Sequence, residues 1–275
     1  MRIQHNLNAM NSLRQLGTNN TNTGKNLEKL SSGFRINRAG DDAAGLAISE
    51  KMRAQINGLE MATKNAEDGI SLIQTAEGGL NETHAILQRM RELAVQAANG
   101  TNQAEDLQSI QDEIDALADE IDRIGDSTKF NGIDLLNGGS MASDGIDFQI
   151  GANNADYESV NLTIASMKAS DLGVDTIDVT ATGDPLGAID AIDAAIADVS
   201  AARAGLGAMQ NRLEHTINNL GVTTENLTAA ESRIRDVDMA KEMMAYTKNN
   251  ILTQAAQAML AQANMQPQGV LQLLQ

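Results

Sequence analysis

Apolar residues recur along most of this chain at intervals of three, four and seven positions, which is the periodicity of α-helices. The pattern is continuous from about residue 43 to residue 98, where Ile73, Leu80 and Leu87 are seven residues apart. A repeat of seven predicts a seam of the coiled-coil type, in which one stripe of the helix packs against a partner. A shorter helix is expected to follow the turn signal Asn99-Gly100 and to end near residue 125.

The most regular pattern lies between about residues 186 and 236. Six apolar residues spaced by seven form the expected core of a rod: Val199, Leu206, Leu213, Leu220, Leu227 and Ile234. A helix of about 50 residues is about 75 Å long. The sequence therefore predicts an elongated molecule.

The two ends of the chain also have helical spacing. A first helix is expected from near Ile3, and residues 31–42 are expected to connect it to the next one. The last helix is expected over about 240–265, and Pro267 is expected to break it before the final residues. Because each helix must cover an apolar stripe, the two ends are expected to pair.

The region 126–185 has a different pattern. Apolar and polar residues alternate around Phe148 and around Leu162, which predicts short strands joined in a hairpin across Gly151–Asp156. Ile177 and Val179 are expected to add another short strand. The predicted fold is therefore mainly α, a long antiparallel coiled coil or helical bundle shaped as a rod, with a small β-hairpin region at about 130–180.

Composition supports long helices rather than a rounded core. The chain has 275 residues, only two prolines and no tryptophan, and aromatic residues make up 2 % of it. It also lacks cysteine, which excludes disulfides, thiolate metal sites and a cysteine nucleophile. No apolar run is long enough to span a membrane, and no conventional secretory signal begins the sequence.

The net charge of −17 is concentrated in one part of the chain. Residues 101–200 carry 3 basic and 21 acidic side chains, whereas both flanking parts are close to neutral. Such acidity argues against nucleic acid as a main partner. From Asn249 to Gln275 there is no charged residue at all. We expect that tail to be buried, either in the fold or against other copies of the chain.

Motifs for catalysis or for cofactor binding are weak throughout. His5, His84 and His215 are far apart, and a phosphate loop at Gly24-Lys25 would need a glycine and a hydroxyl residue that the sequence lacks. The acidic cluster 112–122 most simply forms a solvated helix face, with divalent-cation binding as the alternative. The sequence predicts no catalytic residue, no cofactor, no metal and no enzymatic activity.

One helical stripe has two interpretations. Arg89, Leu93 and Gln96 are spaced to lie on one helix face. They form either an ordinary stripe of a bundle helix or a contact surface for another molecule, and the spacing alone does not choose between these.

Two long motifs, one at each end, make the chain resemble bacterial flagellin. The N-terminal match comprises the opening Met1-Arg2-Ile3-Gln4-His5-Asn6 and the segment Leu30-Ser31-Ser32-Gly33-Phe34-Arg35-Ile36-Asn37-Arg38-Ala39-Gly40-Asp41-Asp42 with the residues up to Ile48. The C-terminal match comprises residues 225–240 and the closing Gln266-Pro267-Gln268-Gly269-Val270-Leu271-Gln272-Leu273-Leu274. The resemblance covers about 1–140 and 186–275, and the middle resembles that of short, Bacillus-like flagellins.

The resemblance implies a structural subunit that polymerises into the bacterial flagellar filament used for swimming. It implies that 1–42 and 236–275 form terminal helices of the inner tube, called D0, and that 43–235 forms the outer-tube rod, called D1. It also implies export through the flagellar type III apparatus and an extracellular location in the filament. The residues expected to form the polymerisation seam are Ile3, Leu7, Met10, Ile251, Met259, Leu260, Leu271 and Leu274. The segments 1–32 and 240–275 are expected to become helical only in the filament.

The implied partners are the chain itself, the filament cap and the hook-associated proteins, and an export chaperone on the C-terminal helix. The family resemblance also implies recognition by the flagellin-sensing Toll-like receptor of the host. The matching residues here are Arg89, Leu93, Gln96 and Glu113, and the same surface is expected to pack between subunits.

Three other interpretations compete with the filament subunit. The hook–filament junction protein shares the terminal motifs and would differ in cellular copy number. A signalling coiled coil predicts dimers and an uninterrupted helical hairpin, which the alternating pattern at 146–164 opposes. A flagellin with a metalloprotease insert needs His-Glu-x-x-His, and residues 85–214 contain no histidine.

Overall fold

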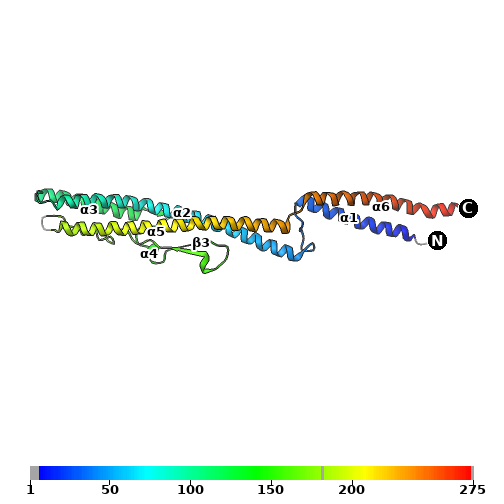
Figure 1. The fold of residues 1–275 in the computed structure, drawn as a ribbon, viewed down its shortest axis with the longest axis horizontal. Helices are drawn as coiled ribbons and strands as arrows, with labels where there is room; N and C mark the ends of the chain where they lie inside the picture. Colours follow the sequence, from blue (N-terminus) through cyan, green and yellow to red (C-terminus); the bar gives the residue numbers. More distant parts are fainter. Residues whose placement is uncertain (1–5, 181–182, 274–275) are drawn as a thin grey trace. The chain divides into compact units, whose positions relative to one another are not determined.

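The computed structural model describes residues 6–180 and 183–273, with side chains at all of these positions except 140 and 267–273. The chain divides into two compact units: a terminal unit formed by Met1–Gln55 with Glu225–Gln275, and a middle unit formed by Ile56–Thr224. In chain order the helices and strands are α1 (Leu7–Ser32), α2 (Ala43–Ala97), α3 (Ala104–Ser127), β1 (Lys129–Phe130), β2 (Ile133–Asp134), α4 (Ser140–Ser143), β3 (Ile146–Gln149), the 3-10 helix η1 (Asp156–Glu158), β4 (Ser159–Leu162), α5 (Pro185–Arg235) and α6 (Met239–Leu273) (Figure 1).

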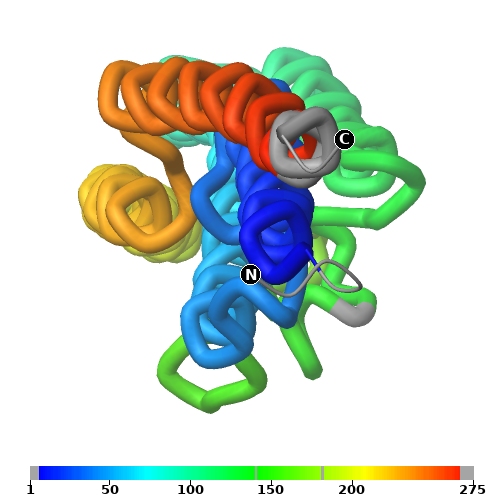
Figure 2. The backbone as a smooth tube through the Cα atoms, turned by 90° about the vertical axis from the view of Figure 1, so that its right-hand side faces the viewer, coloured from blue at the N-terminus to red at the C-terminus, as the bar shows by residue number. Residues whose placement is uncertain are grey.

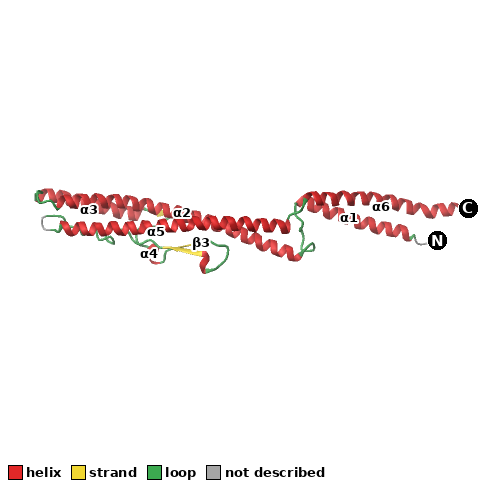
Figure 3. Ribbon diagram, viewed as in Figure 1, coloured by secondary structure: helices red, strands yellow, loops and turns green. Residues whose placement is uncertain are grey.

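The mainly α class with a small β-hairpin region is confirmed (Figure 3). The predicted boundaries of the long helices agree closely with those of α2 and α5. Both are extended runs without an internal proline, so the main-chain hydrogen bonds continue without interruption.

In the middle unit, parts of α2 and α5 pack with α3 around one apolar core. The seams meet there, since Ile73, Leu80 and Leu87 of α2 are fully buried beside Ile114 and Ile121 of α3. Each such side chain contributes roughly 1.5–3 kcal/mol through burial. The first turn of α3 is held by the Asp106 carboxylate, which accepts a hydrogen bond from the Gln103 main-chain N–H at 3.1 Å.

Two antiparallel hairpins follow α3. In the first, Asn131 and Gly132 both have positive φ values, 50° and 81°, and connect β1 to β2. That geometry is typical of the tight Asn-Gly turn. In the second, β3 pairs with β4 so that Phe148 lies opposite Val160, which confirms the hairpin expected across residues 151–156.

The expected strand at Ile177 and Val179 is wrong, because neither residue belongs to a strand. The side chain of Gln111 on α3 takes the place of a strand neighbour. Its amide nitrogen donates to the Ile177 carbonyl oxygen, and its oxygen accepts from the Val179 N–H, both at 2.8 Å. These two main-chain groups thereby have hydrogen-bond partners without forming a sheet. The side chains of Ile177 and Val179 are buried against the bundle.

In the terminal unit, α1 and α6 lie side by side (Figures 1 and 2). Both terminal segments are helical over α1 and α6, and their becoming ordered only in the polymer stays a prediction about the free subunit, to be measured by hydrogen exchange. The partly covered positions of the pair combine small and polar side chains, such as Ala9 and Asn26 of α1 and Ala256 and Asn249 of α6. The polar ones form specific bonds between the two helices.

The expected helix break at Pro267 is also wrong, because α6 continues to Leu273. A proline within a helix has no N–H for the carbonyl four residues earlier, which here belongs to Ala263. The Asn6 side chain supplies the missing donor, since its amide nitrogen lies 2.7 Å from the Ala263 carbonyl oxygen. The same side chain caps α1 by accepting from the Ala9 N–H at 3.1 Å.

We predict that Asn6→Asp weakens the attachment of α1 to α6, because a carboxylate keeps the cap acceptor and loses the donor to Ala263. Asn6→Ala loses both bonds, with about 0.5–2 kcal/mol from the cap alone. Amide hydrogen exchange of the full chain would show faster exchange near Ala263 in both variants, and near Ala9 only in Asn6→Ala.

Pro267→Ala is the control for this prediction, because it restores an N–H for the Ala263 carbonyl within α6. In that background the effect of Asn6→Asp on α6 should shrink. An equal effect in both backgrounds would contradict the compensation between Asn6 and Pro267.

Candidate functional site

The helix pair α1 and α6 has an unusually apolar exposed surface. The described part of α1 has no buried residue, and in α6 Ala263 is buried. The exposed large apolar side chains of the pair are Leu7, Met10, Leu13 and Leu27 on α1 and Met239, Met243, Met244, Ile251, Leu252, Met259 and Met265 on α6. An apolar surface of this extent is typical of a site that binds another protein.

The residues predicted to form a polymerisation seam occupy different places. Leu7, Met10, Ile251 and Met259 are exposed, and Leu260 is half-buried. Leu271 lies in the last turn of α6, where the structure gives no side chain. Ile3 and Leu274 lie outside the described residues.

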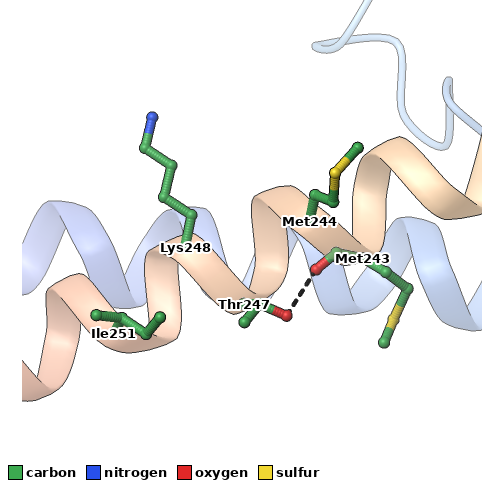
Figure 4. Close-up of a pocket in the computed structure, with 5 residues that line it drawn as sticks. All are labelled: Met243, Met244, Thr247, Lys248 and Ile251. Atoms are coloured by element: carbon green, nitrogen blue, oxygen red, sulfur yellow. Dashed lines mark hydrogen bonds between the residues drawn. The ribbon is translucent and has the colours of Figure 1, made fainter.

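Two hollows mark the surface of this pair. One, of about 410 Å³, lies between the helices, where polar side chains such as Asn11 and Gln15 of α1 face Leu252 and Met259 of α6. The other, of about 420 Å³, lies on α6 and is lined by Met243, Met244, Thr247, Lys248 and Ile251 (Figure 4). Both are open hollows with largely apolar walls on the α6 side.

A polar node fixes how α1 and α6 align. With its amide oriented so that both atoms find partners, Asn26 of α1 donates to the Glu242 carboxylate and accepts from the Asn249 side chain, both at 3.0 Å. Small apolar stripes pack almost equally well when shifted by one turn, whereas these bonds form in one alignment only.

The connectors between helices are joined by a clasp, which we define as Gly33–Arg35 together with Ile234–Val237. The Arg35 N–H donates to the Arg235 carbonyl oxygen at 2.6 Å, and the Val237 N–H donates to the Gly33 carbonyl oxygen at 3.0 Å. Gly33 has a φ of 76° and ends α1 in the left-handed conformation that glycine favours.

Arg235 is the central side chain of the clasp. Its guanidinium lies 4.6 Å from the centre of the Phe34 ring and 2.8 Å from the Glu50 carboxylate, and the side chain is only 12 % exposed. Both halves of the clasp fall within the terminal motifs of the sequence. Sequence reasoning missed that these motifs bind each other, although their position at the helix junctions was a signal.

Ion pairs and hydrogen bonds of acidic and basic side chains hold the rest of the connector between α1 and α2 in place. Arg38 pairs with Glu28 at 2.9 Å. The main-chain N–H groups of Arg38 and Asn37 donate to the Asp41 carboxylate at 3.1 and 3.3 Å, and the bond from Arg38 is the main reason that the pKa of Asp41 is lowered.

The second predicted surface, in the middle unit, is built around Arg89. Its guanidinium contacts Glu113 of α3 at 2.8 and 3.0 Å and Glu92 at 3.2 Å, and hydrogen bonding to Glu113 is the main cause of its raised pKa. Gln96 is exposed on the same helix. The three polar members of the predicted surface therefore reach solvent.

Leu93 does not share that exposure. It is 2 % exposed and belongs to the core of the middle unit. The position four residues after Arg89 faces the bundle interior, so the exposed surface of the single chain is polar and Leu93 lies beneath it.

The predicted rod core divides between the two units. Val199, Leu206, Leu213 and Leu220 are buried in the middle unit. Leu227 and Ile234 are half-buried and belong to the terminal unit.

The acidic segment 112–122 is partly paired. Glu113 contacts Arg89, Glu120 contacts Arg123, and Asp122 accepts from the Ala169 N–H at 2.8 Å. Within residues 6–180 and 183–273, no group of three metal-ligating side chains is placed to hold a metal ion. None of the described helices combines the length and the apolar character that crossing a bilayer requires.

We predict that Arg235→Lys loosens the clasp, because an ammonium keeps the charge opposite Glu50 and loses the flat stacking on Phe34. In a double-mutant cycle with Phe34→Leu, the two residues should show a coupling of about 0.5–2 kcal/mol. Exchange of the Arg35 and Val237 amides would report the loss.

Arg203→Lys in the middle unit is the matched control, since Arg203 pairs with Glu77 at 3.6 Å and is also largely covered. It should leave the Arg35 and Val237 amides unchanged. Independent effects of Arg235→Lys and Phe34→Leu would contradict the role assigned to the stacking.

Comparison with known proteins identifies the family. The family described as bacterial flagellin N-terminal helical region matches residues 3–140, and the bacterial flagellin C-terminal helical region matches residues 189–274. The chain is 60 % identical to the flagellin of Bacillus subtilis strain 168 and 58 % identical to that of Halalkalibacterium halodurans, over the whole of each chain. It is 51 % identical to the flagellar filament 33 kDa core protein of Treponema phagedenis, again over both full lengths.

A solved structure agrees with these matches. The crystal structure of Bacillus cereus flagellin superposes with a TM-score of 0.51 at 34 % identity, and the match covers 61 % of this chain and 94 % of that one. Both terminal motifs and the helical architecture thus have counterparts in one family. The chain belongs to the bacterial flagellins, the structural subunits of the flagellar filament.

Proposed function

We propose that this flagellin polymerises through the α1 and α6 pair, and that the terminal helices form the inner part of the filament wall. The exposed apolar surface of that pair is the observation that carries the proposal. Water contact with these side chains is unfavourable in the free subunit, and burial against neighbouring copies removes it.

The distribution of charge supports the same orientation. Residues 249–275 carry no charge, and the excess acidity lies in 101–200. A segment without charge, such as 249–275, can be buried in a tube wall at little cost, whereas unpaired charges would be expensive there. We therefore assign 1–42 and 236–275 to the inner tube, D0, and 43–235 to the outer tube, D1, with the acidic face outward.

The location and the other partners follow from this role. The subunit is exported through the flagellar type III apparatus and added at the tip, beneath the filament cap, in a filament outside the cell that begins at the hook-associated proteins. Before export, a chaperone covers α6, because a helix with exposed methionines and Ile251, and with no charged residue after Lys248, would otherwise aggregate. A tail deletion that left chaperone binding unchanged would contradict this assignment.

The Arg89 surface is the proposed site for the flagellin-sensing Toll-like receptor. Arg89, Gln96 and Glu113 offer charged and amide groups to a partner, and the buried Leu93 supports the helix beneath them. Because the same surface packs between subunits, the free subunit is the form recognised.

We predict that Ile251→Lys prevents or strongly weakens polymerisation. A lysine at this exposed position would carry a charge into the subunit interface, where an unpaired charge costs several kcal/mol. We expect the critical concentration for seeded assembly to rise by more than about tenfold, since about 1.4 kcal/mol changes an equilibrium constant tenfold. Sedimentation and electron microscopy would measure it.

Tyr157→Lys introduces the same charge at an exposed apolar position of the middle unit and is the control. It should assemble with a critical concentration near that of the unchanged chain. Normal filaments from Ile251→Lys would reject the proposed role of α6.

We predict that Arg89→Ala lowers receptor signalling by the free subunit at least about tenfold, as expected for an arginine central to an interface. Arg91→Ala is the matched control, because Arg91 is similarly exposed and pairs with Asp193 at 2.6 Å. A reporter-cell assay with purified subunits would measure both. Equal loss in the two variants would point to a general effect on the bundle and would reject a specific site.

A further inference from the structure

Helix α6 concentrates exposed sulfur. It holds five of the chain's 13 methionines, namely Met239, Met243, Met244, Met259 and Met265. Their exposed fractions run from 49 % at Met239 to 68 % at Met244. In the middle unit, by contrast, Met90, Met141 and Met167 are buried in the core. The thioethers of α6 are therefore open to small molecules dissolved in water.

The composition of the chain makes these thioethers its main targets for oxidation. With no cysteine and no tryptophan present, the methionine thioether is the side chain most easily oxidised. Figure 4 shows Met243 and Met244 pointing to different sides of α6, with Met244 on the side of Lys248. Both line the open hollow of about 420 Å³, so a molecule the size of hydrogen peroxide reaches either sulfur.

We propose that Met243, Met244 and Met259 are an oxidation site of the free subunit for oxidants of the peroxide class, and that their oxidation excludes the subunit from the filament. The inference rests on the proposed function, because it requires that this face of α6 be buried between subunits. Once buried, the sulfurs would be protected.

The step is an oxygen transfer. A lone pair of the methionine sulfur attacks one peroxide oxygen, the S–O bond forms as the O–O bond breaks, and a proton shift releases the other oxygen as water. The sulfur loses two electrons and the peroxide gains them. The product is methionine sulfoxide, a polar side chain with a strong hydrogen-bond acceptor.

The sulfoxide is harmful where it has no donor. At Met243 the hydroxyl one turn away, on Thr247, already donates to the Met243 carbonyl oxygen at 2.9 Å (Figure 4). Met244 differs, because Lys248 lies one turn along the same side and can donate to its sulfoxide. A buried acceptor without a donor weakens association by roughly tenfold or more, so Met243 is the more damaging position.

The test uses the full chain and needs no mutation. Purified subunits are oxidised in part with hydrogen peroxide, seeded with sheared flagellar filaments and separated by sedimentation. Peptide mass spectrometry then measures the sulfoxide fraction at each methionine in polymer and in supernatant. We expect sulfoxide at Met243 to be depleted in the polymer at least about fivefold. The depletion should be smaller at Met244 and Met259, because Lys248 lies near Met244 and the side-chain amides of Asn11 and Gln15 line the same hollow as Met259. Met61, which is 54 % exposed on α2, is the internal control and should be equal in both fractions.

Variants provide a second measurement. Met243→Gln places a polar group of similar length at the site and should raise the critical concentration about tenfold, whereas Met61→Gln should not. Circular dichroism would confirm that both variants keep their helices.

The outcomes separate the two proposals. If unoxidised subunits do not polymerise on seeds, the proposed function fails, and this inference fails with it. If unoxidised subunits polymerise and sulfoxide at Met243 and Met259 is as frequent in the polymer as in the supernatant, only the oxidation inference is overturned.

Discussion

An α-helix with an apolar stripe must cover that stripe, and the number of helices available to do so differs between the two parts of this chain. In the middle unit, α2, α3 and α5 cover one another, so Ile73, Leu80 and Leu213 are completely removed from water. In the terminal unit, α1 and α6 have mainly each other. Two helices cannot enclose a core, and large apolar side chains such as Leu7 and Ile251 therefore remain in water. The same physical requirement therefore gives a buried core in the middle unit and leaves large apolar side chains exposed in the terminal unit.

The exposed apolar side chains of α1 and α6 give the subunit a surface through which it can polymerise. A subunit that buried all of its apolar area internally would gain little by associating, whereas a pair of exposed stripes gains from each neighbour that covers it. Such a surface also carries a risk before assembly, because it can aggregate or be oxidised. The absence of charge from 249 to 275 favours burial in the filament and increases that risk in the free chain.

Polar contacts determine the alignment that apolar stripes leave open. The bonds of Asn6 to Ala263, of Asn26 to Glu242 and Asn249, and of Arg235 to Glu50 each join segments from opposite ends of the chain. Because each bond depends on direction and on distances of about 3 Å, it forms in one register and is lost on a shift of one turn. These contacts give Asn6, Asn26 and Arg235 a structural role at positions where packing alone would favour an apolar residue.

The sequence by itself determined the long helices, the hairpin across residues 151–156 and the family. Seven-residue spacing such as Leu206 to Leu213 predicts helix over long distances because the hydrogen bonds of a helix are local. Only the tertiary structure decided that Pro267 is accommodated, that Gln111 replaces a strand partner, that Leu93 faces the core, and that Phe34 and Arg235 stack. Each of these depends on a residue far away in the chain that supplies a donor, a cover or a ring, and periodicity along the chain contains no information about such a partner.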